Sequence, residues 1–162
     1  MMRARSQILV VGCVAVIAVI AVLVAARPVP AGRIAHFSVL VRTTDVRHLN
    51  VPPKGSVLGD IEVSNGVAYD AQRRKRIGLT EFSAIVTSRS AAYSTQVSMT
   101  LALNDGQITL AGAAPIQSRH PVRLAITGGT LRYRNLGGEA LLGSAPGGYG
   151  RVTLMPSGAP GG

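Results

Sequence analysis

Cysteine is nearly absent from this sequence, and its scarcity excludes two kinds of stabilisation. The only cysteine among the 162 residues is Cys13, inside a long apolar run. The chain that follows therefore cannot be crosslinked by disulfide bonds, nor hold a structural zinc ion through thiolates. The roughly 136 residues after the apolar run have the length of a single domain, which is enough to bury a core without crosslinks.

Motifs for metals, nucleotides and hydrolysis are also missing. The three histidines, His36, His48 and His120, lie far apart in the sequence with no cysteine and few acids nearby, so they suggest no ligand cluster. No Gly-x-Ser-x-Gly precedes a helical pattern, as a serine hydrolase would require. We therefore expect no bound metal and no cofactor.

Acidic and aromatic residues are scarce as well. Seven Asp and Glu stand against 17 Lys and Arg, a balance that would suit nucleic acid. However, the chain has no Trp, four Tyr and two Phe with which to stack bases, and most of its basic residues are scattered. We expect no nucleic-acid partner. The one dense basic run, RRKR at residues 73–76, is interpreted as a solvated turn or as a patch attracted to anionic lipid headgroups or a cell-wall polymer.

The N-terminal segment contains one long apolar run. Residues 8–26, ILVVGCVAVIAVIAVLVAA, carry no charge and follow Arg3 and Arg5. Residues 1–26 are interpreted as a signal peptide cleaved after Ala26, or as an uncleaved transmembrane helix that anchors the chain. In both cases the basic residues stay in the cytoplasm and the remainder lies outside. We expect a secreted protein, or one anchored to the cell membrane and facing outward.

Beyond residue 26, helical patterns are absent and strand patterns recur. Short alternating runs rich in Val, Ile, Leu and Thr are bounded by Gly, Pro, Asn or Asp. They occupy residues 34–44, 56–63, 77–87, 95–103, 107–113, 122–127 and 151–155. Residues 34–155 are thus predicted to form one all-β domain of seven or eight strands, a barrel or a sandwich. The Pro/Gly-rich residues 27–33 and 156–162 are predicted to be a linker and a disordered tail.

Glycines cluster in GGTLRYRNLGG, residues 128–138. Gly128 and Gly129 follow a strand, as phosphate-binding glycines do, but no Gly-Lys-Ser/Thr ending and no helical pattern come after them. We interpret the two glycine pairs as corners of a closed sheet, where one or both of Gly128 and Gly129 have a backbone angle that other residues resist. The sequence NDG at Asn104–Gly106 predicts a hairpin turn.

Four segments resemble, in the same order, landmarks of the allene oxide cyclase and dirigent superfamily. They are GDIEVSNGVAYD (59–70), KRIGLTEFSAIV (75–86), LNDGQITLAGA (103–113) and RLAITGGTLRYRNLGGEALL (123–142). The resemblance implies an eight-stranded antiparallel β-barrel with an apolar interior cavity, often assembled as a trimer. Family members close an allene oxide ring in the cavity or steer the coupling of phenoxy radicals, and more distant barrels of similar shape cyclise bacterial polyketides.

The functional groups of these families match the sequence only in part. The resemblance places the cyclases' cavity asparagine on Asn65, but their cavity cysteine falls on Ala84, and the first strand has no glutamate. The dirigents' Gly-Gly-Thr-Gly ends here in Leu131, their following acid falls near Arg132, and their arginine falls on Gly137. Neither family's full set is present.

Strand alternation extends this match to a set of pocket candidates. With Asn65 facing inward, alternate residues of its strand up to Tyr69 would line the interior, and the position of Ala84 adds Thr80 and Phe82. The candidate ligand-pocket residues are therefore Asn65, Tyr69, Thr80 and Phe82. Two alternatives stay open: SNGV could be a type I′ turn that uses Asn65 for its backbone, or a small barrel could fill its interior with its own side chains.

Two functions are consistent with this sequence. In the first, an exported barrel binds a small apolar molecule without catalysis. In the alternative, it is a cyclase or isomerase of an unsaturated lipid or polyketide-like substrate, which desolvates and folds that substrate mainly by its shape. Glu139 is the one acid near the predicted end of the barrel, so it is the single candidate for a general acid or base. Whether the protein is an enzyme is left open.

Overall fold

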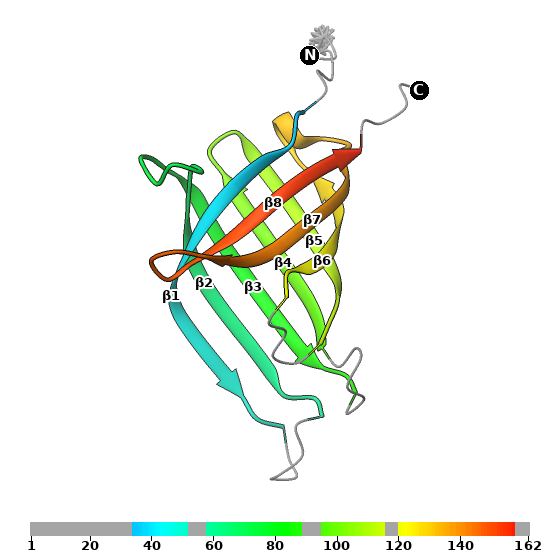
Figure 1. Ribbon diagram of the computed structural model, residues 1–162. Helices are drawn as coiled ribbons and strands as arrows, with labels where there is room; N and C mark the ends of the chain where they lie inside the picture. The colour runs from blue at the N-terminus through cyan, green and yellow to red at the C-terminus, as the bar shows by residue number, and fades with distance from the viewer. Residues whose placement is uncertain (1–33, 52–57, 89–94, 116–119, 158–162) are drawn as a thin grey trace, which may run out of the picture. The chain divides into compact units, whose positions relative to one another are not determined.

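The computed structural model describes residues 34–51, 58–88, 95–115 and 120–157, and within them eight strands form a closed barrel (Figure 1). Each strand is antiparallel to the next, and β8 pairs back with β1. The strands are β1 (Phe37–Leu49), β2 (Ile61–Tyr69), β3 (Arg76–Val86), β4 (Thr95–Leu103), β5 (Gly106–Ala114), β6 (Val122–Gly129), β7 (Gly137–Ala145) and β8 (Tyr149–Ser157). The predicted eight-stranded antiparallel barrel is confirmed.

Helix is limited to one short piece in the described part of the chain, the 3-10 helix η1, Leu131–Tyr133. None of the helical structure described there is long and apolar enough to cross a membrane. The predicted leader at 1–26 and the predicted linker at 27–33 lie outside the described residues, and so do residues 158–162 of the predicted tail.

Two strands differ most from the sequence patterns, for physical reasons. β2 was expected at 56–63 but runs from Ile61 to Tyr69, because Gly59, with a φ of +87°, lies in a turn just before it. β7 was not among the expected runs because its sequence, GGEALLGSA, consists mostly of small residues with low strand propensity. The hairpin predicted at Asn104–Gly106 is present and joins β4 to β5.

The inner face of the barrel is an apolar core. Leu101 on β4 lies opposite Ile108 on β5, and both are fully buried. Val39 on β1 lies opposite Val152 on β8 and joins the same cluster, which shows that the core continues across the closing pair of strands. Large buried side chains of this cluster also include Leu110, Leu124 and Leu154.

The two ends of the barrel differ in how far the strands reach. One end, called here the closed end, carries the start of β1, the β2–β3 and β4–β5 turns, η1 and the end of β8 (top of Figure 1). The opposite end is called the open end. There, β1 pairs with β8 only over Phe37–Val41, and its second half, Arg42–Leu49, pairs with β2 alone. As a result β1, β2 and β3 extend beyond β8 (Figure 1).

η1 places an aromatic side chain in the closed end. Tyr133 is only 5% exposed, and its ring stacks on Phe37 with 6.2 Å between centroids. Its hydroxyl donates to Asp105 Oδ1 at 2.8 Å, and Arg132 Nη1 donates to Asp105 Oδ2 at 2.8 Å. Burial and the bond to Asp105 raise the pKa of Tyr133 well above its usual range. Burial alone would raise the pKa of Asp105, but the hydrogen bonds from Tyr133 and Arg132 outweigh it and lower that pKa.

The paired glycines lie where β6 ends, but the expected backbone angle is not there. Neither Gly128 nor Gly129 has a positive φ. Gly129 is required for space: a Cβ at this position would lie 2.8 Å from Tyr133 Cβ and 2.9 Å from the Gln107 carbonyl oxygen. The second glycine pair does carry the angle, since Gly138 has a φ of +119°. The corner at Gly129 is therefore made by close approach of η1 and not by a left-handed residue.

Candidate functional site

The inner face of the open end is formed by alternate residues of β2 and β3. Gly66 and Ala68 are buried, and Gly66 lies opposite the buried Thr80 on β3. Alternation along both strands then places Ser64 opposite Phe82, and Glu62 opposite Ala84, on the same inner face. The series runs from the core outward to the rim.

Burial decreases along this series toward the open end. Thr80 is only 4% exposed, whereas Phe82 and Ala84 pack against the core and are still partly exposed. Gly66 is needed here because a Cβ would lie 2.9 Å from Thr80 Oγ1 and 2.8 Å from the Arg42 carbonyl oxygen. The glycine therefore lets β1 and the Thr80 hydroxyl approach β2 closely at the inner end of the site.

The rim of the open end carries an acid and a base. His48 on β1 pairs in register with Glu62 on β2, and His48 Nδ1 lies 3.7 Å from Glu62 Oε2. Both side chains are exposed to solvent. Among the described strand residues of the open end, these are the acid and base on the inner face, and each is able to bind a polar group or exchange a proton. No group of three or more metal-ligating side chains occurs in the described parts of the chain.

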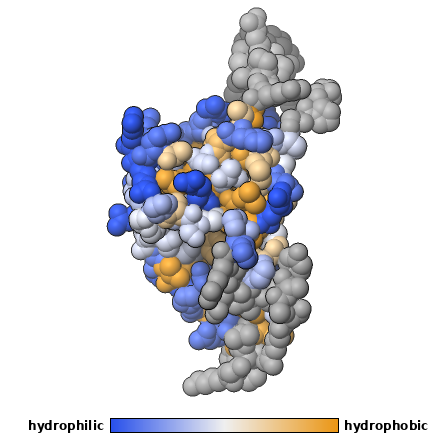
Figure 2. All heavy atoms as spheres, viewed as in Figure 1, coloured by the Kyte–Doolittle hydropathy of each residue, from blue (hydrophilic) through white to orange (hydrophobic). Residues whose placement is uncertain are grey.

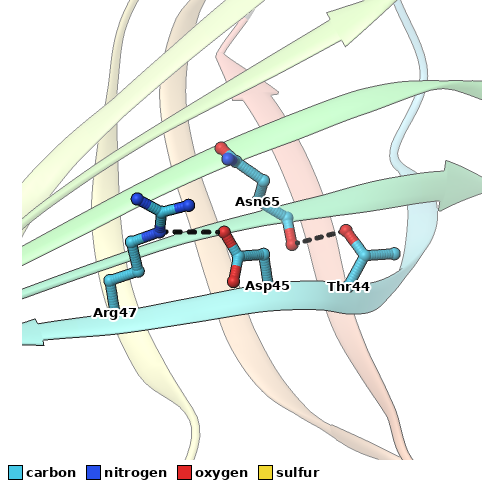
Figure 3. Close-up of polar contacts among 4 residues, drawn as sticks. All are labelled: Thr44, Asp45, Arg47 and Asn65. Carbon is cyan, nitrogen blue, oxygen red and sulfur yellow. Dashed lines mark hydrogen bonds and ion pairs between the residues drawn. The ribbon is translucent and has the colours of Figure 1, made fainter.

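Asn65 faces the opposite way from the prediction. It is exposed between the inward Ser64 and Gly66, so it lies on the outer face. Its partner in register is Asp45, one residue past a bulge in β1, and its carbonyl oxygen accepts a hydrogen bond from Thr44 Oγ1 at 3.2 Å (Figure 3). The alternation inferred from the sequence was therefore shifted by one residue. The type I′ turn is also excluded, because SNGV lies in the middle of β2.

Tyr69 and Glu139 likewise lie outside the barrel. Tyr69 shares the outer face of β2 with Asn65, and its ring meets the ring of Tyr149 edge to face at 5.8 Å. Glu139 precedes the buried Ala140 on β7 and forms an ion pair with Arg123. These positions separate both residues from the inner face, whereas Thr80 and Phe82 lie on it. That these two contact a ligand stays a prediction.

Sequence reasoning missed Ser64, Glu62 and His48 as inner-face residues. The one-residue shift on β2 hid the first two. His48 was assessed only as a metal ligand, and its strand was expected to end at residue 44. The available signal was Gly66 itself, since a glycine within a strand marks a close approach of neighbouring chain and hence the crowded inner face.

Several solved structures share this barrel, each less than 25% identical in sequence. A pyocyanin demethylase matches with a TM-score of 0.67 and 21% identity, over 76% of this chain and 100% of the demethylase. An exo-specific intermolecular Diels-Alderase matches with a TM-score of 0.57 and 19% identity, over 74% and 96%. A pterocarpan synthase dirigent protein matches with a TM-score of 0.52 and 21% identity, over 73% and 88%. This chain has the fold of the dirigent-like barrels.

The similarity of this dirigent-like barrel to known proteins is found in its structure. No protein-family model matches the sequence, and no curated protein matches it either. The resemblance inferred from the four ordered sequence segments is thus confirmed at the level of the fold.

Proposed function

We propose that this dirigent-like barrel binds a small, largely apolar molecule through its open end, against the inner faces of β1, β2 and β3. The observation that carries the proposal is incomplete burial of apolar inner-face residues. Phe82 and Ala84 pack against the core but remain partly exposed, unlike Leu101 and Ile108 deeper inside. A barrel filled only by its own side chains would bury these positions as completely as the rest of its core.

The polar groups of the open end define the kind of ligand. Ser64, His48 and Glu62 lie on the rim, and the inner face beyond them is apolar apart from Thr43 and Thr80. Few polar groups around an apolar lining are typical of small-molecule sites. The best-fitting ligand has an apolar body and one hydroxyl, carbonyl or amine at the end nearest the rim. The demethylase, Diels-Alderase and dirigent protein of the same fold support a role in small-molecule chemistry.

The test compares a large side chain placed on the inner face of β3 with the same side chain placed on its outer face. Ala84→Phe places a large ring on the inner face, and Ser83→Phe places the same ring on the outer face of the same strand. We expect Ala84→Phe to weaken the binding of the apolar dye Nile red at least tenfold, and Ser83→Phe to bind as the wild type does. Fluorescence titration measures the affinity, and the circular dichroism spectrum verifies that both variants are folded. Equal binding by the two variants, or no binding by the wild type, would overturn the proposal.

A second candidate function is catalysis, favoured by the pairing of His48 with Glu62 on the inner face. Such a pair is able to move a proton while the apolar wall folds a flexible substrate for cyclisation or isomerisation. The experiment offers an unsaturated epoxide and a linear polyene and follows products by chromatography. We expect turnover to fall in Glu62→Gln and Ala84→Phe but not in Asn65→Ala, because Asn65 lies outside. Absence of turnover by the wild type, or equal loss in Asn65→Ala, contradicts catalysis at this site.

A further inference from the structure

Charge is distributed unequally along the barrel. Among the described residues of the closed end, six basic side chains stand against the two carboxylates Asp70 and Asp105. Around the second half of β1 and the start of β2 at the open end, the three acids Asp45, Asp60 and Glu62 stand against the two arginines Arg42 and Arg47. In the space-filling view hydrophilic side chains are dense at the upper left, toward the closed end, and are also present along the right edge and at the lower left (Figure 2). The six basic residues are Arg73, Arg74, Lys75, Arg76, Arg132 and Arg134.

The acids of the closed end do not neutralise the basic turn, defined here as Arg73–Arg76. Asp105 is engaged by Arg132 and Tyr133. Asp70 Oδ1 accepts a hydrogen bond from the Arg74 backbone N–H at 2.7 Å, so its carboxylate holds the turn's backbone. All four basic side chains of the turn are exposed, and none forms an ion pair with another described residue.

The basic turn is fixed in position on the barrel. The Asp70 N–H donates to the Lys75 carbonyl at 3.0 Å, and the Arg73 N–H donates to the Asp70 carbonyl at 3.0 Å. Arg73 adopts a positive φ of 61°, and its guanidinium lies 4.8 Å from the centroid of the Tyr149 ring. The turn thus presents Arg74, Lys75 and Arg76 at a fixed position on the surface of the barrel.

The chain enters the barrel at this same end. β1 begins at Phe37 near η1 and the β4–β5 turn (Figure 1). The apolar run expected to be a signal peptide or an uncleaved membrane anchor ends at residue 26, and seven residues, 27–33, separate it from Ile34. Seven extended residues span at most about 25 Å. An anchor in a bilayer would therefore hold the closed end, and not the open end, within that distance of the lipid headgroups.

We propose that the closed end of the barrel docks on the surface of a membrane that contains anionic lipids, through the basic turn. The attraction between this turn and anionic headgroups fixes the orientation of the barrel. The open end, with its acidic residues, then faces away from the membrane. The ligand site proposed above would be reached from the aqueous side, although docking does not depend on that site having a ligand.

The first experiment measures which end of the full chain lies near the headgroups. In a Cys13→Ser background, which removes the only cysteine, a fluorophore is attached at Ala71→Cys, beside the basic turn, or at Leu49→Cys at the open end. The protein is reconstituted in vesicles of phosphatidylcholine, with or without phosphatidylglycerol, that carry a headgroup-linked nitroxide quencher. We expect phosphatidylglycerol to increase quenching at residue 71 but not at residue 49, and high salt to reverse the increase. Equal quenching with and without phosphatidylglycerol, or equal quenching at both positions, would overturn the proposal.

The second experiment removes the charges of the turn. The triple variant Arg74→Gln/Lys75→Gln/Arg76→Gln keeps Arg73 on Tyr149. A matched control removes three exposed arginines from β1 and β8. Residues 27–162 contain every strand and every strand pairing of the barrel, so they suffice for a vesicle sedimentation assay with phosphatidylglycerol. Each basic residue near an anionic surface strengthens binding roughly fivefold, so we expect a loss on the order of 100-fold in the turn variant. The proposal is wrong if the control loses as much binding. That control is Arg42→Gln/Arg47→Gln/Arg151→Gln.

Discussion

Gly128 and Gly129 are adjacent in the sequence but have very different surroundings. A Cβ added to Gly128 meets only Thr109 Oγ1 at 3.4 Å, whereas one added to Gly129 collides with η1 and with Gln107. We expect Gly129→Ala to lower the free energy of unfolding by roughly 1 to 3 kcal/mol, the usual cost of overpacking, because the backbone atoms it meets cannot move aside. Gly128→Ala should change it by less than about 0.5 kcal/mol.

Urea denaturation of the two alanine variants checks this difference. Because Gly129 supports a corner and not a phosphate loop, inorganic phosphate should stabilise neither variant nor the wild type beyond the general effect of salt. Equal stability of the two variants would contradict the collision with η1, and a phosphate-dependent shift lost only in Gly129→Ala would revive the phosphate loop.

Tyr133 makes the stability of the barrel sensitive to alkaline pH. Its pKa is raised in the folded state, above the value of about 10 of an unfolded chain. Its contribution to stability is therefore complete below about pH 10 and is lost as the pH rises above that value, because the unfolded chain ionises first. We expect Tyr133→Phe to cost about 1 kcal/mol at neutral pH, through the lost hydrogen bond to Asp105, and to show a smaller further loss above pH 10.

The measurement is urea denaturation of wild type and Tyr133→Phe on both sides of pH 10. The other ionising groups are common to both proteins, so only the difference between the two pH profiles reports on Tyr133. Parallel loss of stability in wild type and variant above pH 10 would contradict the role assigned to the buried hydroxyl.

At the scale of the strand, the sequence predicted where most of the strands lie but not which face of β2 is inside. Strand positions depend on local alternation and turns, and those of β3, β4, β5 and β6 could be predicted to within a few residues. Because side chains alternate along a strand, the orientation of one residue decides which face of β2 points inward. The resemblance assigned the inward orientation to Asn65. Gly66 sets it instead, since only a residue without a side chain fits between Thr80 and the backbone of β1.

The strand β7 and the helix η1 show a second limit of local patterns. β7 is held by pairing with β6 and β8 on both sides, so it forms despite its small residues. The Tyr133–Asp105 contact joins residues 28 positions apart, and no local pattern encodes it. Only part of the candidate site could be predicted, because local patterns do not encode contacts between strands. Thr80 and Phe82 follow from alternation on one strand, whereas His48 and Glu62 meet only through the register between two strands.

At the scale of the whole molecule, the outer face of β3 carries exposed apolar side chains. Leu79 is 49% exposed and Ile85 is 40% exposed, and Val67 and Ile61 lie opposite them on β2. We expect this face to be covered in a closed homo-oligomer, a trimer in line with the family resemblance, because exposed apolar residues on adjacent strands favour association. Sedimentation equilibrium should give a mass above that of the monomer, and Leu79→Lys/Ile85→Lys should reduce it to the monomer.

A matched control for this association lies on the same strand. Glu81 occupies an outer position of β3 between the two apolar residues, and Glu81→Lys changes charge without removing apolar surface. The control is expected to reduce the mass far less than the double variant. A wild-type protein that stays monomeric at high concentration contradicts the oligomer.

Closure of the barrel between β1 and β8 has a consequence for the order in which the chain folds. Ser38 and Thr153 share a hydrogen bond of 3.1 Å across the seam although they are 115 positions apart. The seam consists of only five residue pairs, while closing a loop of this length costs about 4 kcal/mol in chain entropy. β1 can pair with β2 as soon as both are synthesised, but its other edge has no partner until the final strand has left the ribosome. We therefore expect the nascent chain to remain an open sheet, with its core facing water, until synthesis is nearly complete, which would be compatible with the export predicted from residues 1–26.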